Sequence, residues 1–272
     1  MQESYLNSII TAIVEGLTEF IPISSTGHMI VIGDLMAFTG EKAATFQIFI
    51  QLGAILAAFL IYRERFWGLI PKNPGSNLIQ QLFHGESTPT GMHFIVSVVP
   101  ILVAGFLFHG TIKANLFSSK TVAIGLIVGG LLMIIAERLP IKQTAETLEE
   151  ISVKNAFFIG LGQCMALWPG MSRSGSTMIA GLLVGVKHKA VADFTFIIAV
   201  PVMVAAVGYD ILKSWHLLEL ADLPRFVLGF AIAFIIGWLS IKWFLNILKR
   251  FNLFPFGIYR IILGGLVYWL LV

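Results

Sequence analysis

One short stretch of the chain concentrates the side chains that could do chemistry. Residues 15–28 read Glu-Gly-Leu-Thr-Glu-Phe-Ile-Pro-Ile-Ser-Ser-Thr-Gly-His, so carboxylates, hydroxyls and an imidazole interrupt an otherwise apolar region. Ionisable groups in such a region cost free energy, and they are usually kept for a function. Glu15 and Glu19 are four residues apart, which places both carboxylates on one face of a helix.

Pro22 and the hydroxyl residues after it indicate that this helix breaks and a second one begins. Proline has no N–H and disfavours a helical residue before it. Ser24, Ser25 and Thr26 are natural N-cap residues, and a helix N-terminus binds anions through its free N–H groups. The stretch therefore predicts two acids, a candidate nucleophile and an anion cradle in one broken helix. The simpler alternative is a plain turn beside a solvated carboxylate pair.

The composition favours a membrane setting for this broken helix. Hydrophobic residues make up 57% of the 272 residues and charged residues only 12%, with a mean hydropathy of +0.88. These values exclude an ordinary soluble domain and predict an all-α polytopic membrane protein, with residues 1–272 forming a single membrane domain. The start, Met-Gln-Glu-Ser, lacks the basic region of a signal peptide. The net charge of +3 does not suggest a nucleic-acid partner.

The apolar segments are of two lengths. A helix that crosses a membrane needs about 20 residues, and four segments joined by Pro–Ser turns are shorter than this. We therefore expect about six transmembrane helices plus two re-entrant helix pairs. The short segments are 8–22, 24–38, 155–169 and 174–186, and the longer ones are 45–62, 92–109, 121–136, 193–209, 226–245 and 257–272.

The two halves of the chain resemble each other. The segment 46–62 aligns with 194–210 at an offset of 148, and the turn that begins at Pro22 aligns with the one that begins at Pro169. We therefore predict a first repeat over 1–136 and a second repeat over 155–272. If each half crosses the membrane three times, the second repeat has the opposite orientation to the first. Inverted repeats with short broken segments predict a binding site near the interface between the repeats.

The distribution of Lys and Arg residues among the loops predicts how the chain is oriented in the membrane. If the N-terminus is outside, twelve of the 18 Lys and Arg residues fall in inside loops, five fall outside, and Arg173 remains in the second turn. The positive-inside rule then places both termini outside, with the turns of the two helix pairs meeting in the interior. The inside set is Arg63, Arg65, Lys72, Arg138, Lys142, Lys154, Lys187, Lys189, Lys242, Lys249, Arg250 and Arg260.

The second turn, residues 168–177, adds a cation and further hydroxyls. Arg173 is the only basic residue between Lys154 and Lys187. A guanidinium binds phosphate oxygens in bidentate fashion and stays charged. The alternative is a structural ion pair between this arginine and one of the two acids, although buried pairs seldom improve stability over apolar packing.

These motifs resemble the undecaprenyl-diphosphatase (bacitracin-resistance) family of bacterial inner membranes, over nearly the whole chain. The resemblance rests on Glu15-x-x-x-Glu19, on the turn Pro22-x-Ser-Ser-Thr-Gly-His28, and on Pro169-Gly-x-Ser172-Arg173-Ser174-x-x-Thr177. It implies hydrolysis of undecaprenyl diphosphate to the monophosphate and inorganic phosphate. It also implies a divalent cation, Mg²⁺ or Ca²⁺, and an active site that faces the periplasm in the inner membrane.

Residue types in both turns suit phosphoryl transfer, which requires positioning and charge neutralisation around an in-line nucleophile. We predict Ser25 as the nucleophile, with direct attack by water as the alternative. Glu19 would act as a base or hold the metal with Glu15, and His28 would orient groups or donate a proton. Arg173 would clamp the diphosphate together with donors from both turns, namely Ser24, Thr26, Gly27, Ser172, Ser174 and Thr177.

Several of these assignments have simpler alternatives. Ser24 and Thr26 could serve only as helix caps, and His28 could only line the wall. A transporter or flippase of a phosphorylated polyprenyl lipid would have a similar architecture, because fold does not fix function. A nucleophile and an acid opposite an arginine favour the hydrolase, since binding alone does not need them. The substrate lipid and the surrounding membrane lipids are the expected partners, and the oligomeric state, for example a homodimer, is left open.

Overall fold

The computed structural model describes residues 5–69, 89–116, 118–217 and 219–272, and it confirms the all-α class. No β-strand occurs among these residues, apart from a single bridge between Ala145 and Val186. The helices are α1 (Tyr5–Thr18), α2 (Ser25–Leu35), α3 (Glu41–Ile61), α4 (Arg63–Trp67), α6 (Gly91–Leu116), α7 (Ser119–Arg138), α8 (Val153–Gln163), α9 (Arg173–Leu183), α10 (His188–Ser214), α11 (Leu223–Ile247) and α12 (Phe254–Leu271).

Six of these helices, α3, α6, α7, α10, α11 and α12, are long and apolar enough to cross a membrane. They coincide with the six long apolar segments of the sequence. Their outward faces carry large exposed apolar side chains such as Phe106, Leu212 and Trp269, which are 76%, 76% and 78% exposed. So much exposed apolar surface would be unfavourable in water and suits contact with lipid. The chain is therefore a polytopic membrane protein.

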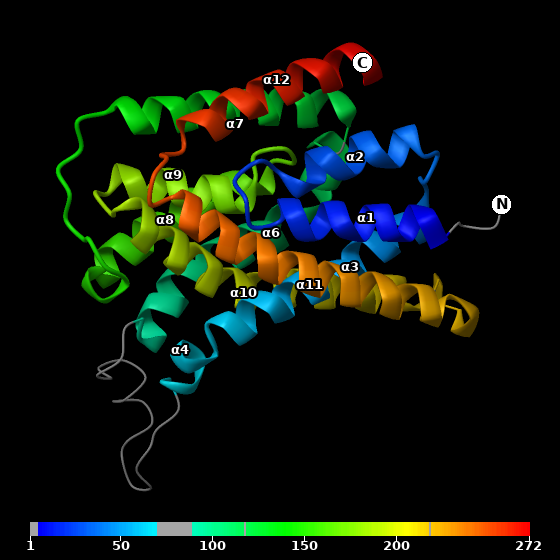
Figure 1. Cartoon of the computed structure of the whole chain (residues 1–272), viewed down its shortest axis with the longest axis horizontal. Coiled ribbons are helices and arrows are strands. Elements are labelled where there is room, and N and C mark those ends of the chain that lie inside the picture. Colours follow the sequence, from blue (N-terminus) through cyan, green and yellow to red (C-terminus); the bar gives the residue numbers. More distant parts are fainter. Residues whose placement is uncertain (1–4, 70–88, 117, 218) are drawn as a thin grey trace, which may run out of the picture.

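The four short helices form two hairpins, α1–α2 and α8–α9. In Figure 1 the beginning of α1 and the C-terminus lie toward the same end of the molecule, and α8–α9 lies toward the other end. Each hairpin packs against a long helix from the other half of the chain, α1 against α11 and α8 against α6. The two turns therefore come together in the interior of the helix assembly.

The N-termini of α2 and α9 are built in the same way. Ser24 and Ser172 are the N-caps, both with positive φ (71° and 64°), and each side chain accepts a hydrogen bond from the N–H of a glycine three residues later. The predicted cap at Ser24 is thus present. The division into repeats over 1–136 and 155–272 stays a prediction, and these matching caps, 148 residues apart, support it.

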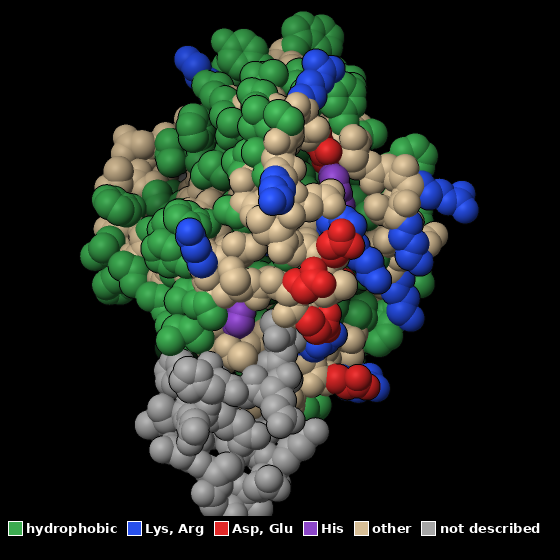
Figure 2. Space-filling view, turned by 90° about the vertical axis from the view of Figure 1, so that its left-hand side faces the viewer, with side chains coloured by type: hydrophobic (Ala, Val, Ile, Leu, Met, Phe, Trp, Pro, Cys, Tyr) green, Lys and Arg blue, Asp and Glu red, His purple; other side chains and the backbone are tan. Residues whose placement is uncertain are grey.

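Charged side chains gather on the end of the molecule away from the C-terminus, as Figure 2 shows. Ion pairs there join loops that are distant in sequence. Arg65 lies 2.6 Å from Glu149, and Lys187 lies 2.7 Å from Glu146. Of the predicted inside cations, Lys72 lies outside the described residues.

Candidate active site

The two predicted turns touch each other directly. The Ser174 hydroxyl, at the start of α9, donates a hydrogen bond to the Ile21 carbonyl (3.2 Å), which belongs to the turn between α1 and α2. Phe20 in the same turn packs edge-on against Phe196 of α10, with ring centroids 5.3 Å apart. Apolar packing therefore surrounds the point at which the polar groups of both hairpins meet.

Glu19 is the centre of the polar cluster. Its Oε2 accepts a hydrogen bond from the Ser25 hydroxyl (2.6 Å), and its Oε1 accepts one from Nη2 of Arg173 (3.3 Å). Nη1 of Arg173 also donates to the Thr195 carbonyl of α10 (3.3 Å). The side chains of Glu19 and Arg173 are only 8% and 11% exposed. Two residues separated by 154 positions therefore form a buried ion pair beside a hydroxyl.

Glu15 lies one helical turn before Glu19 and is fully buried in α1. Among the described residues, neither of its carboxylate oxygens has a hydrogen-bond partner. A buried polar group without a partner loses its hydration and gains nothing in return, so such a group needs an explanation. A cation or a proton at this position would supply the missing partner.

Glu15 and Glu19 can be compared with the ligands that usually hold a divalent cation. The described residues contain no group of three or more His, Cys, Asp or Glu side chains that could hold a metal ion. Mg²⁺ is commonly held by one or two carboxylates, with substrate phosphate oxygens and water as its other ligands. The unpartnered oxygens of Glu15 beside Glu19 fit such a substrate-completed site. They do not form an all-protein cage.

His28 lies in the first turns of α2, and its ring is fixed on both sides. Nδ1 is 2.8 Å from the Ser24 carbonyl, and Nε2 is 2.7 Å from the Tyr259 hydroxyl of α12, whose ring stacks on the imidazole. A carbonyl can only accept, so Nδ1 carries the hydrogen, and in the neutral ring Nε2 accepts from Tyr259. Both contacts lie outside the group formed by Glu19, Ser25 and Arg173.

The first turn uses its capping groups internally. The Ser24 hydroxyl accepts a hydrogen bond from the Gly27 N–H (3.3 Å), and both residues are buried. The Gly27 N–H is therefore already engaged, whereas the Ser24 hydroxyl keeps its own hydrogen and can still donate it. Thr26 is exposed, and Ser25 is half-buried. Ser25 is the hydroxyl of this turn that lies against the central carboxylate.

The second turn also uses its hydroxyls locally. Ser172 caps α9 by accepting from the Gly175 N–H (3.1 Å), and its hydroxyl lies 3.1 Å from that of Ser174. The Thr177 hydroxyl donates to the Arg173 carbonyl (2.7 Å). These contacts shape the turn that presents the guanidinium, so the predicted phosphate ligands of this turn also hold it in place.

Arg260 was not among the predicted site residues. The charge count assigned it to a cytoplasmic loop, which is wrong, because it lies in α12 and is fully buried. Its guanidinium donates to backbone carbonyls of both turns, Met171 at 2.7 Å and Pro22 at 3.5 Å. A basic residue inside an apolar segment was the signal that could have identified it.

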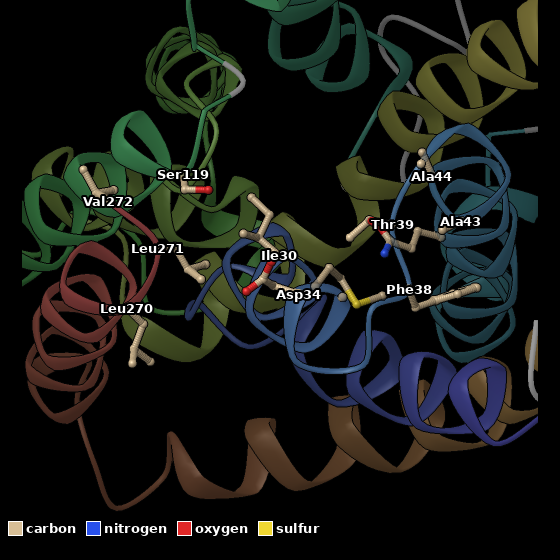
Figure 3. Close-up of a pocket in the computed structure, with 14 residues that line it drawn as sticks. Ile30, Asp34, Phe38, Thr39, Ala43, Ala44, Ser119, Leu270, Leu271 and Val272 are labelled. Atoms are coloured by element: carbon tan, nitrogen blue, oxygen red, sulfur yellow. The ribbon is translucent and has the colours of Figure 1, made fainter. Parts of the chain in front are cut away.

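A cavity of about 610 Å³ lies elsewhere, toward the end of the molecule that carries the C-terminus. Figure 3 shows Ile30 and Asp34 of α2 facing it, with Leu270 and Leu271 of α12 on another side. No predicted site residue lines this cavity. It is therefore separate from the group around Glu19.

Fold and site together define a class: a polytopic helical membrane protein whose interior holds a hydroxyl, a carboxylate and a guanidinium in one hydrogen-bonded group. The chain matches the family described as Bacitracin resistance protein BacA over residues 8–266 and belongs to that family. It is also 47% identical, over 274 aligned residues and 97% of each chain, to a protein named undecaprenyl-diphosphatase from Geobacillus thermodenitrificans (strain NG80-2).

Proposed function

We propose that this protein hydrolyses undecaprenyl diphosphate to undecaprenyl phosphate and inorganic phosphate, which recycles the lipid carrier of cell-wall synthesis. The family and the name of the relative support this activity. The structural observation that carries the proposal is the 2.6 Å hydrogen bond from the Ser25 hydroxyl to Glu19, opposite Arg173. A nucleophile within hydrogen-bond reach of a base is the arrangement that covalent catalysis needs.

In the proposed reaction, Oγ of Ser25 attacks the terminal phosphorus and its proton passes to Glu19. The bond from that phosphorus to the bridging oxygen breaks, and undecaprenyl phosphate leaves. Water then attacks the phosphorus of the phosphoserine, the bond from that phosphorus to Oγ of Ser25 breaks, and Glu19 returns its proton to Oγ. Both protons of the water end on the inorganic phosphate, which leaves as H2PO4−. If water attacks directly, Ser25 relays one proton of that water to Glu19, which passes it to the departing inorganic phosphate, and the products are the same.

Arg173 would neutralise charge on the phosphoryl oxygens. A guanidinium has five N–H donors, and within the described part of the chain Arg173 uses two of them, for Glu19 and Thr195. Its Nε has no partner among the described residues. Donors therefore remain for a phosphate after the arginine is anchored, which is the arrangement expected of a preorganised clamp.

We also propose that Glu15 and Glu19 hold a divalent cation, Mg²⁺ or Ca²⁺, together with oxygens of the substrate. Such an ion would neutralise the diphosphate and its leaving group. The unpartnered, fully buried carboxylate of Glu15 supports this assignment. His28, held by Tyr259, would orient the first turn beside the substrate.

The orientation in the cell is part of the same proposal. We place the protein in the bacterial inner membrane with both ends of the chain and the entrance to the active site on the periplasmic side. The gathering of charged side chains at the opposite end supports this orientation. A homodimer is proposed as one assembly, which mass photometry in detergent can distinguish from a monomer.

Phosphate release by the purified protein, with several prenyl diphosphates and with or without a chelator, tests the function. We expect release by the wild type, loss with the chelator, and a fall of about 10²–10⁴-fold for Glu19→Gln, as expected for removal of a general base. Glu41→Gln, at an exposed position at the start of α3, is the matched control. A folded wild type that moves the lipid between leaflets but releases no phosphate would favour the flippase instead.

A further inference from the structure

Arg260 buries a positive charge without an opposing charge. The residue is fully buried in α12, and among the described residues no carboxylate lies within ion-pair distance of its guanidinium. Removing a cation from water is costly unless hydrogen bonds compensate for the lost hydration. The position of these hydrogen bonds therefore indicates what the buried charge does.

Within the described part of the chain, the compensation comes from backbone carbonyls, and Nε of Arg260 has no partner. Nη2 of Arg260 donates to Met171 (2.7 Å), Gly170 (3.0 Å) and Gly125 (3.4 Å), and Nη1 donates to Pro22 (3.5 Å). Pro22 lies just before the cap of α2, and Gly170 and Met171 lie just before the cap of α9. One guanidinium thus contacts both turns and α7.

Both turns need such support. The caps that follow them, Ser24 and Ser172, have positive φ values, which cost free energy for a residue other than glycine and persist only where the surroundings hold them. Because a trans peptide is planar, holding the Met171 carbonyl toward Arg260 directs the Ser172 N–H the opposite way. The guanidinium therefore sets how the start of α9 is presented.

We infer that Arg260 is a positioning residue for the hydrolysis: it fixes the two turns so that Ser25 and Arg173 meet at Glu19. This inference rests on the proposed function. Among the described residues, the hydrogen bonds of Arg260 go to backbone carbonyls of the turns and α7 and not to Ser25, Glu19 or Arg173, so it acts through the backbone of the turns. Its loss should lower the rate of the chemical step more than the affinity for substrate.

The neighbouring glycines allow a test that keeps the arginine. A Cβ on Gly129 of α7 would overlap Nη2 of Arg260, so Gly129→Ala must displace the guanidinium. A Cβ on Gly264 of α12 would instead lie 2.8 Å from the Ala123 carbonyl, and its nearest atoms all belong to α7 and none to Arg260, so Gly264→Ala disturbs the contact between α7 and α12 alone. A Cβ on Gly265 of α12 would meet nothing within 4 Å.

Steady-state phosphate release and thermal unfolding would be measured for Arg260→Lys, Gly129→Ala, Gly264→Ala and Gly265→Ala, with activity expressed per folded protein. We expect kcat to fall roughly 10–10²-fold for Arg260→Lys and Gly129→Ala, as misplacement of reacting groups by about 1 Å does, while KM stays within about threefold. Gly264→Ala should lower Tm and keep kcat, and Gly265→Ala should change neither.

Each outcome decides between the proposals. A wild type that releases no phosphate would refute the proposed function itself. An active wild type together with folded Arg260→Lys and Gly129→Ala variants of normal kcat would overturn the positioning role alone. The role would also be overturned if kcat fell equally in Gly264→Ala, or if neither Arg260→Lys nor Gly129→Ala folded, because the residue would then serve stability.

Discussion

Replacing Arg173 by lysine separates the charge of this residue from its geometry. The guanidinium reaches the Glu19 carboxylate and the Thr195 carbonyl at the same time, both at 3.3 Å. An ammonium is a point charge without a planar fork, so it cannot reproduce both anchors and still present donors to phosphate. A lost hydrogen bond to a charged group is worth about 1.5–3 kcal/mol, which corresponds to roughly 10–10²-fold in kcat for Arg173→Lys.

Arg173→Ala removes the charge as well. Loss of an arginine that stabilises a phosphoryl-transfer transition state costs on the order of 10³-fold or more, and 10³-fold corresponds to about 4 kcal/mol. The expected order of kcat is therefore wild type, then Lys, then Ala. The assay is phosphate release from a prenyl diphosphate, with the folded fraction checked by size-exclusion chromatography.

The matched control is Arg225→Lys. Arg225 is also nearly buried and pairs with a carboxylate, Asp222 at 2.6 Å, but it lies at the start of α11, and its partner belongs to neither turn. Its kcat should stay within about twofold of the wild type, because no group of the site is touched. If Arg173→Lys were as active as this control, the bidentate clamp would be wrong and only the charge would matter.

Three further predictions concern the nucleophile, the histidine and the orientation. Ser25→Ala should lower kcat by at least about 10²-fold, whereas the exposed neighbour Thr26→Ala should stay close to wild type; equal losses would remove the special role of Ser25. Tyr259→Phe removes the hydroxyl that holds Nε2 of His28, so a loss of about 1 kcal/mol, roughly fivefold in kcat, is expected. When His28→Ala is already present, adding Tyr259→Phe should lower kcat no further, and additive losses would show that the pair does not act together. Tags at Met1 and Val272 should both be protease-accessible in spheroplasts, and protection of either tag would contradict the predicted orientation.

The long helices could be predicted from the sequence because the membrane imposes their length. A span needs about 20 apolar residues, and the segment 45–62 accordingly lies within α3, Glu41–Ile61, to within one residue at its end. The hairpin turns could be predicted because proline and the capping serines signal helix ends locally. Ser24 caps α2 at the predicted turn.

The contact between Glu19 and Arg173 could be anticipated for a different reason. A charged side chain in an apolar interior needs a partner, and the second turn offers a single basic residue. The roles of the hydroxyls could not be predicted in this way, because serine is the expected residue at a helix start whether it caps the helix or binds a ligand. The structure shows the Ser24 and Ser172 hydroxyls accepting from backbone N–H groups, which no spacing rule distinguishes from phosphate binding.

The two buried arginines Arg173 and Arg260 differ in the atoms that their nitrogens contact. Nε lacks a partner in both arginines among the described residues, so the difference lies in their terminal nitrogens. Those of Arg173 contact one carboxylate and one carbonyl, so each keeps an N–H that can donate to an anion. Those of Arg260 contact four backbone carbonyls in both turns and α7, three of them through Nη2. Counting positive residues treats the two alike, and only the atoms that their nitrogens contact separate a ligand for phosphate from a support for the turns. An arginine whose terminal donors are already engaged by the backbone should therefore affect the rate through geometry, whereas one with free donors should affect it through charge and hydrogen bonding at the phosphoryl group.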